Sequence, residues 1–318
     1  MNTLKYKIYI DGQAGTTGLK IHERLANRPD LEVLCVDGEK RKDPEVRRAI
    51  LNEADLVFLC LPDDAARESV SLISSGKTRV IDASTAHRID PGWVYGLPEL
   101  NGAQRERIAH AARVSVPGCH ATGFVLLLYP FITEGAVPRD YAVTCHSVTG
   151  YSGGGRKLIE QYEGSARGVH MAASRHYALG LSHKHLPEML QISGLAAPPL
   201  FTPIVGDFYQ GMAVAVPLFS RLLKQKLTVK EAHAFLAGYY KGERFVKVMP
   251  LDPEAGADGG YFDPTACNGT NRAELFIFGN DEQILLLARL DNLGKGASGA
   301  AVQCMNIMLG MDEGFGLE

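Results

Sequence analysis

The 318-residue sequence lacks an excess of charge of one sign and lacks any long apolar run. Its 33 Lys and Arg are balanced by 36 Asp and Glu, which does not favour nucleic acid or an anionic membrane as a partner. The longest notable apolar stretch, Phe124–Tyr129, is far shorter than the roughly 20 residues that a membrane-spanning helix needs. We therefore expect a protein that binds neither nucleic acid nor membrane.

Targeting signals and paired cysteines are also missing. The first residues show neither the apolar core of a signal peptide nor the character of a transit peptide, so we expect a cytoplasmic protein. None of the six cysteines forms a C-x-x-C pair, so neither a zinc ribbon nor a thioredoxin-type site is indicated. Four of them lie among apolar residues and are interpreted as buried small side chains: Cys35, Cys60, Cys145 and Cys304.

Low-complexity tracts and internal repeats are absent, and the 46% hydrophobic and 22% charged residues are typical of a globular protein. The length suggests about two domains. In the first part of the chain, short apolar segments alternate with helical patterns, which predicts an α/β, doubly wound parallel sheet. The expected strands are Tyr6–Ile10, Leu31–Val36, Asp55–Leu61 and Arg79–Asp82, and Arg113–Val116 is expected to end a further strand. The expected helices are Thr17–Asn27 and Asp63–Ser74.

The pattern changes after Cys119. An apolar helix is expected over Thr122–Thr133, with Pro130 kinking or ending it. Segments rich in β-branched and aromatic residues then predict an α+β domain with a second sheet, mixed or antiparallel. The expected strands are Tyr141–Thr149, Ala213–Leu218, Phe245–Val248, Glu274–Phe278 and Gln283–Asp291. A closely packed helix rich in small residues is expected over Gly296–Leu309.

A glycine loop joins the first strand to the first helix. Its pattern, G-x-x-G-x-x-G, permits a tight turn and a close approach of the backbone to a pyrophosphate, which then lies at the helix N-terminus. A glycine triplet alone often marks only a turn, but its place at a strand-to-helix junction favours a dinucleotide site. The predicted cofactor-binding residues are Gly12, Gln13, Gly15, Thr16, Thr17 and Gly18.

The end of the second strand bears on the choice of cofactor. Asp37 has about the spacing of an acidic residue that holds the ribose 2′-hydroxyl of NAD. The cationic cluster that follows it, with Arg41 and Lys42, would instead accept the 2′-phosphate of NADP. A solvated loop is the alternative interpretation of these charges. We expect NADP, with Arg41 as a contact.

Cys119 is the candidate nucleophile. It follows Pro117 and Gly118 and lies at the N-terminal end of the predicted apolar helix, where the helix dipole and free N–H groups stabilise a thiolate. A thiolate attacks acyl carbons readily. The alternative is a buried loop cysteine, but its position just after the predicted dinucleotide unit favours a catalytic role.

The segment His183–Glu188 supplies the candidate acid/base groups. Histidine titrates near neutrality, so His185 is predicted to carry a proton for Cys119 and His183 to support it or contact substrate. Their order is left open. The spacing of the two histidines also suits a metal, but no further ligand cluster lies nearby in sequence, so we expect no metal. Glu188 is expected to orient an imidazole or bind substrate.

Two glycine-rich loops supply the remaining candidate site residues. The loop Ser147–Arg156 offers hydroxyls, backbone N–H groups and an arginine, which suit an anion such as phosphate or carboxylate, unless it is a flexible hairpin loop. The predicted substrate contacts in it are Ser147, Gly150 and Arg156. In the loop Asp291–Gly296, Asn292 is expected to bind the nicotinamide amide, whereas Lys295 is interpreted as a surface charge.

Six motifs, taken in order along essentially the whole chain, resemble the N-acetyl-γ-glutamyl-phosphate reductases, relatives of aspartate-semialdehyde dehydrogenase. Each motif alone is unspecific, but the joint match is specific. The compact length and the sequence DASTAHR resemble the shorter, type 2 branch of that family. His120 departs from the pattern, because many members carry an aromatic residue there. The motifs are Gly12–Gly18, Asp82–Arg88, Gly96–Asn101, Pro117–Gly123, His183–Glu188 and Asp291–Gly299.

The resemblance implies NADPH-dependent reduction of N-acetyl-γ-glutamyl phosphate to N-acetyl-L-glutamate 5-semialdehyde with release of phosphate, in arginine biosynthesis. Cys119 would form a thioester with the acyl group, and His185 would handle the proton. Ser84, in the Asp82–Arg88 motif, joins the predicted cofactor contacts. The alternatives are an aspartate-semialdehyde or other acyl-phosphate dehydrogenase and, less favoured, a non-catalytic NADP-sensing regulator.

The resemblance also implies the domain organisation. We expect a dinucleotide-binding domain over residues 1–118, completed by a C-terminal helix over 293–318 that returns to it. Residues 119–292 would form the catalytic, substrate-binding and oligomerisation domain. A homo-oligomer, either a dimer or a tetramer, is expected.

Overall fold

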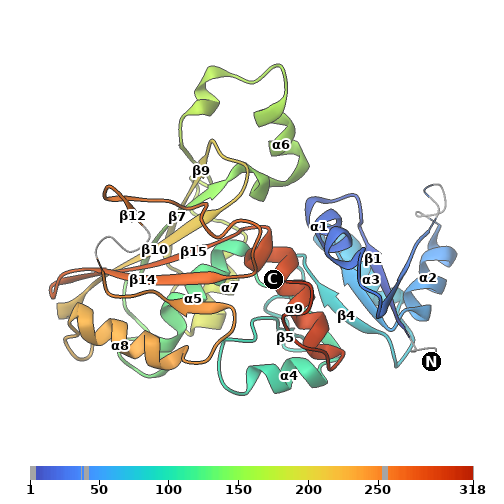
Figure 1. Cartoon of the computed structure of the whole chain (residues 1–318), viewed down its shortest axis with the longest axis horizontal. Coiled ribbons are helices and arrows are strands. Elements are labelled where there is room, and N and C mark those ends of the chain that lie inside the picture. Colours follow the sequence, from blue (N-terminus) through green and yellow to red (C-terminus); the bar gives the residue numbers. More distant parts are fainter. Residues whose placement is uncertain (1–4, 37, 39–42, 253–256, 318) are drawn as a thin grey trace. The chain divides into compact units, whose positions relative to one another are not determined.

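The computed structural model describes residues 5–36, 38, 43–252 and 257–317. It divides into two compact units, one formed by residues 1–117 with 297–318 and the other by residues 118–296 (Figure 1). Asp37 and Arg41, the two residues that bear on the choice between NAD and NADP, lie outside the described residues.

The first unit is built on a six-stranded sheet with the order β2-β1-β3-β4-β6-β5, in which every neighbouring pair is parallel. All four residues of β3 are buried, as expected for a strand covered on both faces. The predicted doubly wound sheet is therefore confirmed. The strands are β1 Tyr6–Asp11, β2 Leu31–Leu34, β3 Leu56–Leu59, β4 Arg79–Asp82, β5 Val94–Tyr95 and β6 Arg113–Ser115.

Helices connect these strands. The two predicted helices form, and the sequence analysis missed α2 and α4. The signal for α2 was present, because the side chain of Asp43 accepts hydrogen bonds from the backbone N–H groups of Glu45 and Val46, and Pro44 stands at the first helical position. The helices are α1 Thr16–Leu25, α2 Pro44–Glu53, α3 Asp63–Leu72 and α4 Gln104–His110.

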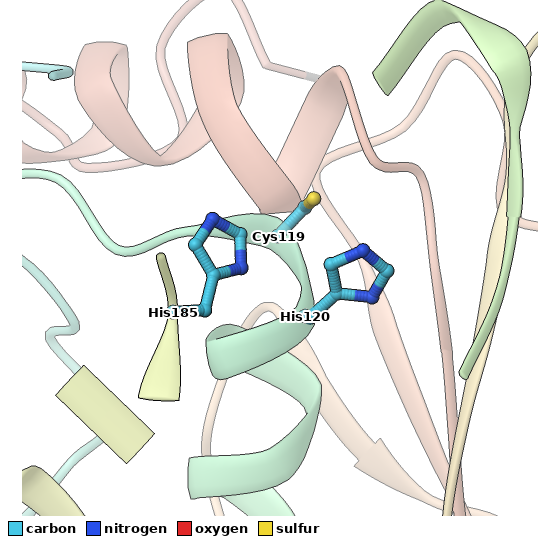
Figure 2. A group of neighbouring side chains, drawn as sticks. All are labelled: Cys119, His120 and His185. Atoms are coloured by element: carbon cyan, nitrogen blue, oxygen red, sulfur yellow. The ribbon is translucent and has the colours of Figure 1, made fainter. Parts of the chain in front are cut away.

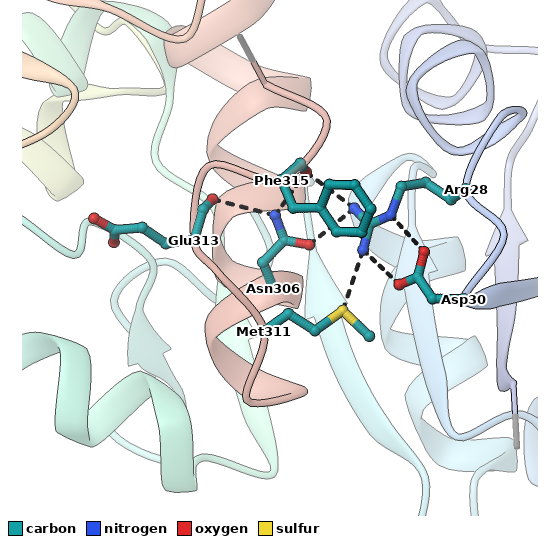
Figure 3. Close-up of polar contacts among 6 residues, drawn as sticks. All are labelled: Arg28, Asp30, Asn306, Met311, Glu313 and Phe315. Carbon is teal, nitrogen blue, oxygen red and sulfur yellow. Dashed lines mark hydrogen bonds and ion pairs between the residues drawn. The ribbon is translucent and has the colours of Figure 1, made fainter. Parts of the chain in front are cut away.

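The C-terminal helix α9 (Gly299–Met308) belongs to this first unit and packs against α4 and α1. Arg28, a buried arginine after α1, holds the segment that follows α9 in place (Figure 3). Arg28 donates to both carboxylate oxygens of Asp30 at 2.8 and 2.7 Å, to the Asn306 side chain at 3.0 Å and to the Phe315 carbonyl at 3.0 Å. Its guanidinium also lies 3.9 Å from the centre of the Phe315 ring, so one cation holds three segments.

The second unit contains a seven-stranded sheet with the order β11-β14-β15-β10-β7-β9-β8. It is mixed, because β7 with β9 and β11 with β14 pair in parallel while the other pairs are antiparallel. The sequence analysis missed β8 and β9; Pro203 interrupts the strand pattern of β9 because proline cannot donate to a ladder. The strands are β7 Thr144–Gly150, β8 Arg175–His176, β9 Leu200–Gly206, β10 Met212–Phe219, β11 Val246–Val248, β14 Ala273–Gly279 and β15 Gln283–Leu290.

Helix α5 (Cys119–Thr133) lies on one face of this sheet, against β10 and β15. Helix α8 (Val229–Tyr239) covers the same face beside it, since the Tyr240 hydroxyl donates to the Leu126 carbonyl at 2.7 Å. The predicted start of α5 was wrong, because the helix begins three residues earlier, at Cys119 itself. Pro130 lies inside the helix, which continues to Thr133.

The remaining elements are short. Helices α6 (Gly155–Glu163) and α7 (Leu186–Ser193) and the small hairpin of β12 (Ala257–Asp258) and β13 (Tyr261–Phe262) complete the second unit. A π-helical turn, Gly294–Ser298, precedes α9. Among the described residues, no helix has the length and apolarity needed to cross a membrane.

The cysteine prediction was partly wrong. Cys145 and Cys304 are buried, but Cys60 is half-buried and Cys35 is exposed, because it lies just past the end of β2, at the edge of the sheet.

Candidate active site

Cys119 is the first residue of α5 and is half-buried. The residue before it, Gly118, is the N-cap and has extended backbone, with no side chain capping the helix. The first-turn N–H groups and the positive end of the helix dipole therefore act where the thiol lies, and both stabilise a thiolate or an oxyanion formed on an acyl group bound to it.

Glu188 holds the loop in front of the nucleophile. Its carboxylate, 1% exposed in the first turn of α7, accepts a hydrogen bond from the Gly118 N–H at 2.8 Å. This contact ties α7 to the start of α5. The sequence analysis expected Glu188 to orient an imidazole or bind substrate; the contact with Gly118 adds a role in fixing the backbone beside Cys119.

Two histidines flank the thiol (Figure 2). The Cys119 sulfur and one ring nitrogen each of His120 and His185 all lie within 4.8 Å of one another. His185 is the N-cap residue of α7 and only 4% exposed. Its backbone N–H donates to His183 Nδ1 at 3.2 Å, and the two rings meet edge-on at 4.7 Å. The structure thus brings Cys119, His185 and His183 together.

His120 was predicted only as a departure from a family pattern, yet it lies at the centre of the site. Its Nδ1 is 2.7 Å from the Ser147 hydroxyl on β7, and its Nε2 is 2.8 Å from the Tyr177 hydroxyl. Burial, with the nearby charges of His183 and Lys184, lowers the pKa of His120 to about 3, so the ring stays neutral. Its position next to Cys119 was the one signal in the sequence.

Tyr177 was not predicted. Burial raises the pKa of its phenol, and a negative charge on Cys119 raises that pKa further, so the hydroxyl keeps its proton beside the nucleophile. Its segment, just after the short strand β8, carries no motif.

The turn before α9 forms the other side of the nucleophile. A Cβ on Gly296 would lie 2.7 Å from the Cys119 Cβ, so only glycine fits there. The carboxylate of Asp291 shapes this turn by accepting from the N–H groups of Leu293 at 2.8 Å and Gly269 at 2.8 Å. Lys295 was predicted to be a surface charge, and this was wrong: it is 0% exposed, because the π-helical turn directs it inward near the Phe245 ring.

Asn292 and the Ser147–Arg156 loop are held by contacts within the second unit. The Asn292 side chain accepts from the Gly211 N–H at 2.8 Å and donates to the Ser152 hydroxyl at 3.0 Å. A Cβ on Gly150 would lie 2.6 Å from the Tyr209 carbonyl oxygen. The predicted substrate contacts differ in position: Ser147 is fully buried with its hydroxyl on His120, whereas Arg156 is exposed on α6.

The donor types around the thiol also bear on metal binding. A thiolate and two imidazoles are ligands that zinc takes. Among the residues that the structure describes, Cys119, His120 and His185 are the group of side chains with this donor set.

In the first unit, the glycine loop has the geometry of a phosphate cradle. Gly12 has φ +94°, and a Cβ on it would lie 2.3 Å from the Cys60 carbonyl oxygen. A Cβ on Gly18 would lie 2.4 Å from the Gly12 carbonyl oxygen. Helix α1 begins at Thr16 without a side-chain cap, so its first N–H groups are directed at the loop and suit a pyrophosphate.

Ser84 lies in a second loop of the first unit. Its N–H and hydroxyl both donate to the buried Asp82, at 2.8 and 2.7 Å, and His87 Nδ1 lies 2.6 Å from the same carboxylate. The His87 ring stacks on Trp93 with centroids 4.2 Å apart. These contacts connect the loop that follows β4 to the buried carboxylate at the end of that strand.

Comparisons with known proteins cover both units. Residues 119–292 match the family model "Semialdehyde dehydrogenase, dimerisation domain", and residues 7–111 match "Semialdehyde dehydrogenase, NAD binding domain". The chain is 52% identical over 98% of its length to N-acetyl-gamma-glutamyl-phosphate reductase 2 of a Nostoc species, covering 99% of that protein. It is 50% identical over 97% of its length to the Pseudomonas putida protein of the same name, covering 98% of it.

Solved structures show the same fold at low identity. Aspartate semialdehyde dehydrogenase from Francisella tularensis superposes with a TM-score of 0.71 at 16% identity, over 96% of this chain and 100% of that one. The Vibrio cholerae aspartate semialdehyde dehydrogenase II complexed with ASA superposes with a TM-score of 0.69 at 13% identity, over 96% of this chain and 98% of that one.

Proposed function

The chain belongs to the N-acetyl-gamma-glutamyl-phosphate reductase family, and from this premise we propose that it reduces N-acetyl-γ-glutamyl phosphate to N-acetyl-L-glutamate 5-semialdehyde with NADPH, in arginine biosynthesis. The observation that carries the proposal is the thiol at the start of α5 with an imidazole nitrogen of His185 within 4.8 Å of it. A nucleophile and a proton carrier in this arrangement suit acyl transfer.

The cofactor would be held at the glycine loop. The φ of Gly12 and the lack of room for a Cβ on Gly12 or Gly18 fit a pyrophosphate that approaches the backbone closely. Thr16 and Thr17 in the first turn of α1, with Gln13 and Gly15 before them, would supply N–H and hydroxyl donors. Ser84, Asn292 and Arg41 remain proposed contacts. When bound, NADPH supplies the hydride that brings the acyl group to the level of an aldehyde.

The acyl transfer belongs to Cys119. Its thiolate attacks the γ-carbonyl carbon of the acyl phosphate, a C–S bond forms, and the C–O bond to phosphate breaks, so phosphate leaves and a thioester remains. The N–H groups of the first turn of α5 stabilise the oxyanion during this step. His185 would donate a proton to the carbonyl oxygen as reduction gives the thiohemiacetal, and take the same proton back as the C–S bond breaks, which releases the aldehyde and the thiolate.

Other residues would bind and orient the substrate. His183 would support His185, because its Nδ1 accepts a hydrogen bond from the His185 backbone N–H. Glu188 keeps Gly118, and with it Cys119, in place. The exposed Arg156 and the backbone of Gly150 are proposed contacts for an anionic group of the substrate, and Ser147 would act through His120.

The assembly and location are proposed more broadly. The matched family model is described as a dimerisation domain and spans residues 119–292, which supports a homo-oligomer, dimer or tetramer, formed through the second unit. A biosynthetic reductase with no membrane-spanning helix among its described residues is proposed to act in the cytoplasm.

The test is the reverse reaction, the phosphate-dependent oxidation of N-acetyl-glutamate semialdehyde, followed by NADPH formation. We expect turnover with NADP and phosphate, a lower rate with NAD, and none without phosphate. Cys119→Ser should lose turnover, while the matched control Cys35→Ser, at an exposed cysteine, should keep it. A clear preference for aspartate semialdehyde would reassign the substrate, and full activity of Cys119→Ser would favour a non-catalytic role for the cysteine.

A further inference from the structure

Three side chains from separate segments form one hydrogen-bonded chain beside the nucleophile. Ser147 on β7, His120 in the first turn of α5 and Tyr177 after β8 are joined by contacts of 2.7 and 2.8 Å. Among the residues that the structure describes, neither hydroxyl has a second hydrogen-bond partner. The three groups carry three polar hydrogens when His120 is neutral, but the chain has only two internal bonds. One hydrogen is therefore left over at one end.

Burial decides which end that is. If Tyr177 donated to His120 and His120 to Ser147, the Ser147 hydrogen would be left without an acceptor at a residue that is 0% exposed. A buried donor without a partner is unfavourable. If Ser147 donates to His120 Nδ1 and His120 Nε2–H donates to Tyr177, the remaining hydrogen belongs to the phenol, which is only half-buried.

The position of the open end favours the same direction. The Tyr177 hydroxyl is 2.8 Å from His120 Nε2, and a ring nitrogen of His120 lies within 4.8 Å of the Cys119 sulfur. The free phenol hydrogen is therefore close to the nucleophile, where a thiolate would attract it. His183, Lys184 and His185 are the other ionisable groups around these three side chains. Because His120 is neutral, one of its ring nitrogens accepts a hydrogen bond and the other donates one.

We propose that Tyr177 is a further catalytic residue whose hydroxyl donates to the Cys119 thiolate and then to the oxygen of the acyl group that the sulfur carries. His120 and Ser147 are positioning residues that set its direction. The inference deepens the proposed function, because it takes Cys119 as the nucleophile. No covalent bond changes in this role: the phenol keeps its proton and stabilises negative charge as that charge moves from sulfur to oxygen.

The first experiment measures the Cys119 thiol without substrate, so it stands even if the proposed substrate is wrong. The rate of iodoacetamide alkylation at Cys119 is followed by peptide mass spectrometry from about pH 5 to 10, with the exposed Cys35 as an internal reference. For Tyr177→Phe we expect the midpoint of the profile to rise by about one pH unit. Tyr162→Phe, which removes another buried phenol hydroxyl of this unit, should leave it unchanged.

The second experiment measures turnover. Tyr177→Phe should lower kcat by roughly 10- to 100-fold with little change in KM, because the lost hydrogen bond acts on charge that forms in the transition state. Ser147→Ala, at a residue sealed from substrate, should lower kcat several-fold by removing the donor that sets the His120 tautomer. The double variant should be no slower than Tyr177→Phe alone, because Ser147 acts through Tyr177.

These outcomes distinguish a hydrogen-bonded chain that acts on Cys119 from side chains that only pack beside it. Unchanged kcat and an unchanged alkylation profile in Tyr177→Phe would overturn the proposal, and so would fully additive losses in the double variant. Both substitutions remove single hydroxyl groups and keep the ring or the strand, and an unchanged melting temperature verifies the fold. If the semialdehyde is not a substrate but the alkylation midpoint moves as expected, the proposed function fails and the hydrogen-bonded chain stands.

Discussion

In the glycine loop of the first unit, the contacts that restrict Gly18 come from Gly12 and Gln13, a few positions earlier in the chain. Around Cys119 in the second unit, by contrast, the contacts span 27 residues from His120 to Ser147, 57 to Tyr177 and 70 from Gly118 to Glu188. Gly12 is restricted by the Cys60 carbonyl oxygen at the end of a neighbouring strand, so the glycine loop is shaped by backbone from two segments, whereas the nucleophile is surrounded by side chains from several elements. Substitutions should therefore affect the two regions independently.

The largest difference between the two regions is expected from Cys119→Ser, which should nearly abolish turnover and leave cofactor binding intact. A serine hydroxyl is a far weaker nucleophile than a thiolate at neutral pH, so turnover should fall by roughly 1,000-fold or more. Binding of NADP, measured by calorimetry, should remain at the wild-type affinity because the glycine loop is untouched. A large loss of cofactor affinity would show that the two regions are not independent.

Gly12→Ala changes the glycine loop of the first unit instead and leaves the residues around Cys119 unchanged. The backbone at Gly12 has φ +94°, and the new Cβ would lie 2.3 Å from the Cys60 carbonyl oxygen, so we expect a loss of about 2–4 kcal/mol in the free energy of unfolding. Gly15→Ala is the matched control, because its Cβ would meet only contacts of 3.5 and 3.6 Å. Urea denaturation followed by circular dichroism compares them. Equal stability of the two variants would contradict the strain argument.

Within the second unit, Gly296→Ala tests how closely the turn before α9 fixes the nucleophile. The Cβ would lie 2.7 Å from the Cys119 Cβ, and the displaced thiol should lower kcat by roughly 10- to 100-fold. Gly238→Ala in α8, where a Cβ meets nothing within 4 Å, serves as the control and should leave kcat unchanged. Equal rates for wild type and Gly296→Ala would mean that the turn yields without moving the sulfur.

The smallest effect is expected at the Arg28 anchor of the first unit. A hydrogen bond from Arg28 lowers the pKa of Asp30 below its ordinary value, so the ionised pair stabilises the fold above that ordinary value. This contribution is lost as the pH falls through the lowered pKa. Asp30→Asn should therefore melt a few degrees below wild type at pH 7, and the difference should shrink below about pH 4. Calorimetry over this range measures it; a constant difference would exclude ionisation as the cause.

Much of the fold followed from local pattern. The parallel sheet of the first unit was predicted from apolar runs and the alternation with helices, and five of its six strands were found. Helix α4 and strand β5 were missed because they are short and their pattern is weak. In the second unit, β9 was missed because its pairing with β7 in register, Ser147 opposite Pro203, depends on a partner strand distant in sequence.

The sequence by itself determined the glycine loop, the thiol at a helix start and the histidine pair, because each is a chemical requirement expressed within a few consecutive residues. Only the tertiary structure decided that His120 is buried and neutral, that Tyr177 and Ser147 are its partners, and that Lys295 is directed inward. Burial and hydrogen-bond direction depend on which strands and helices meet, and a linear pattern does not carry that information.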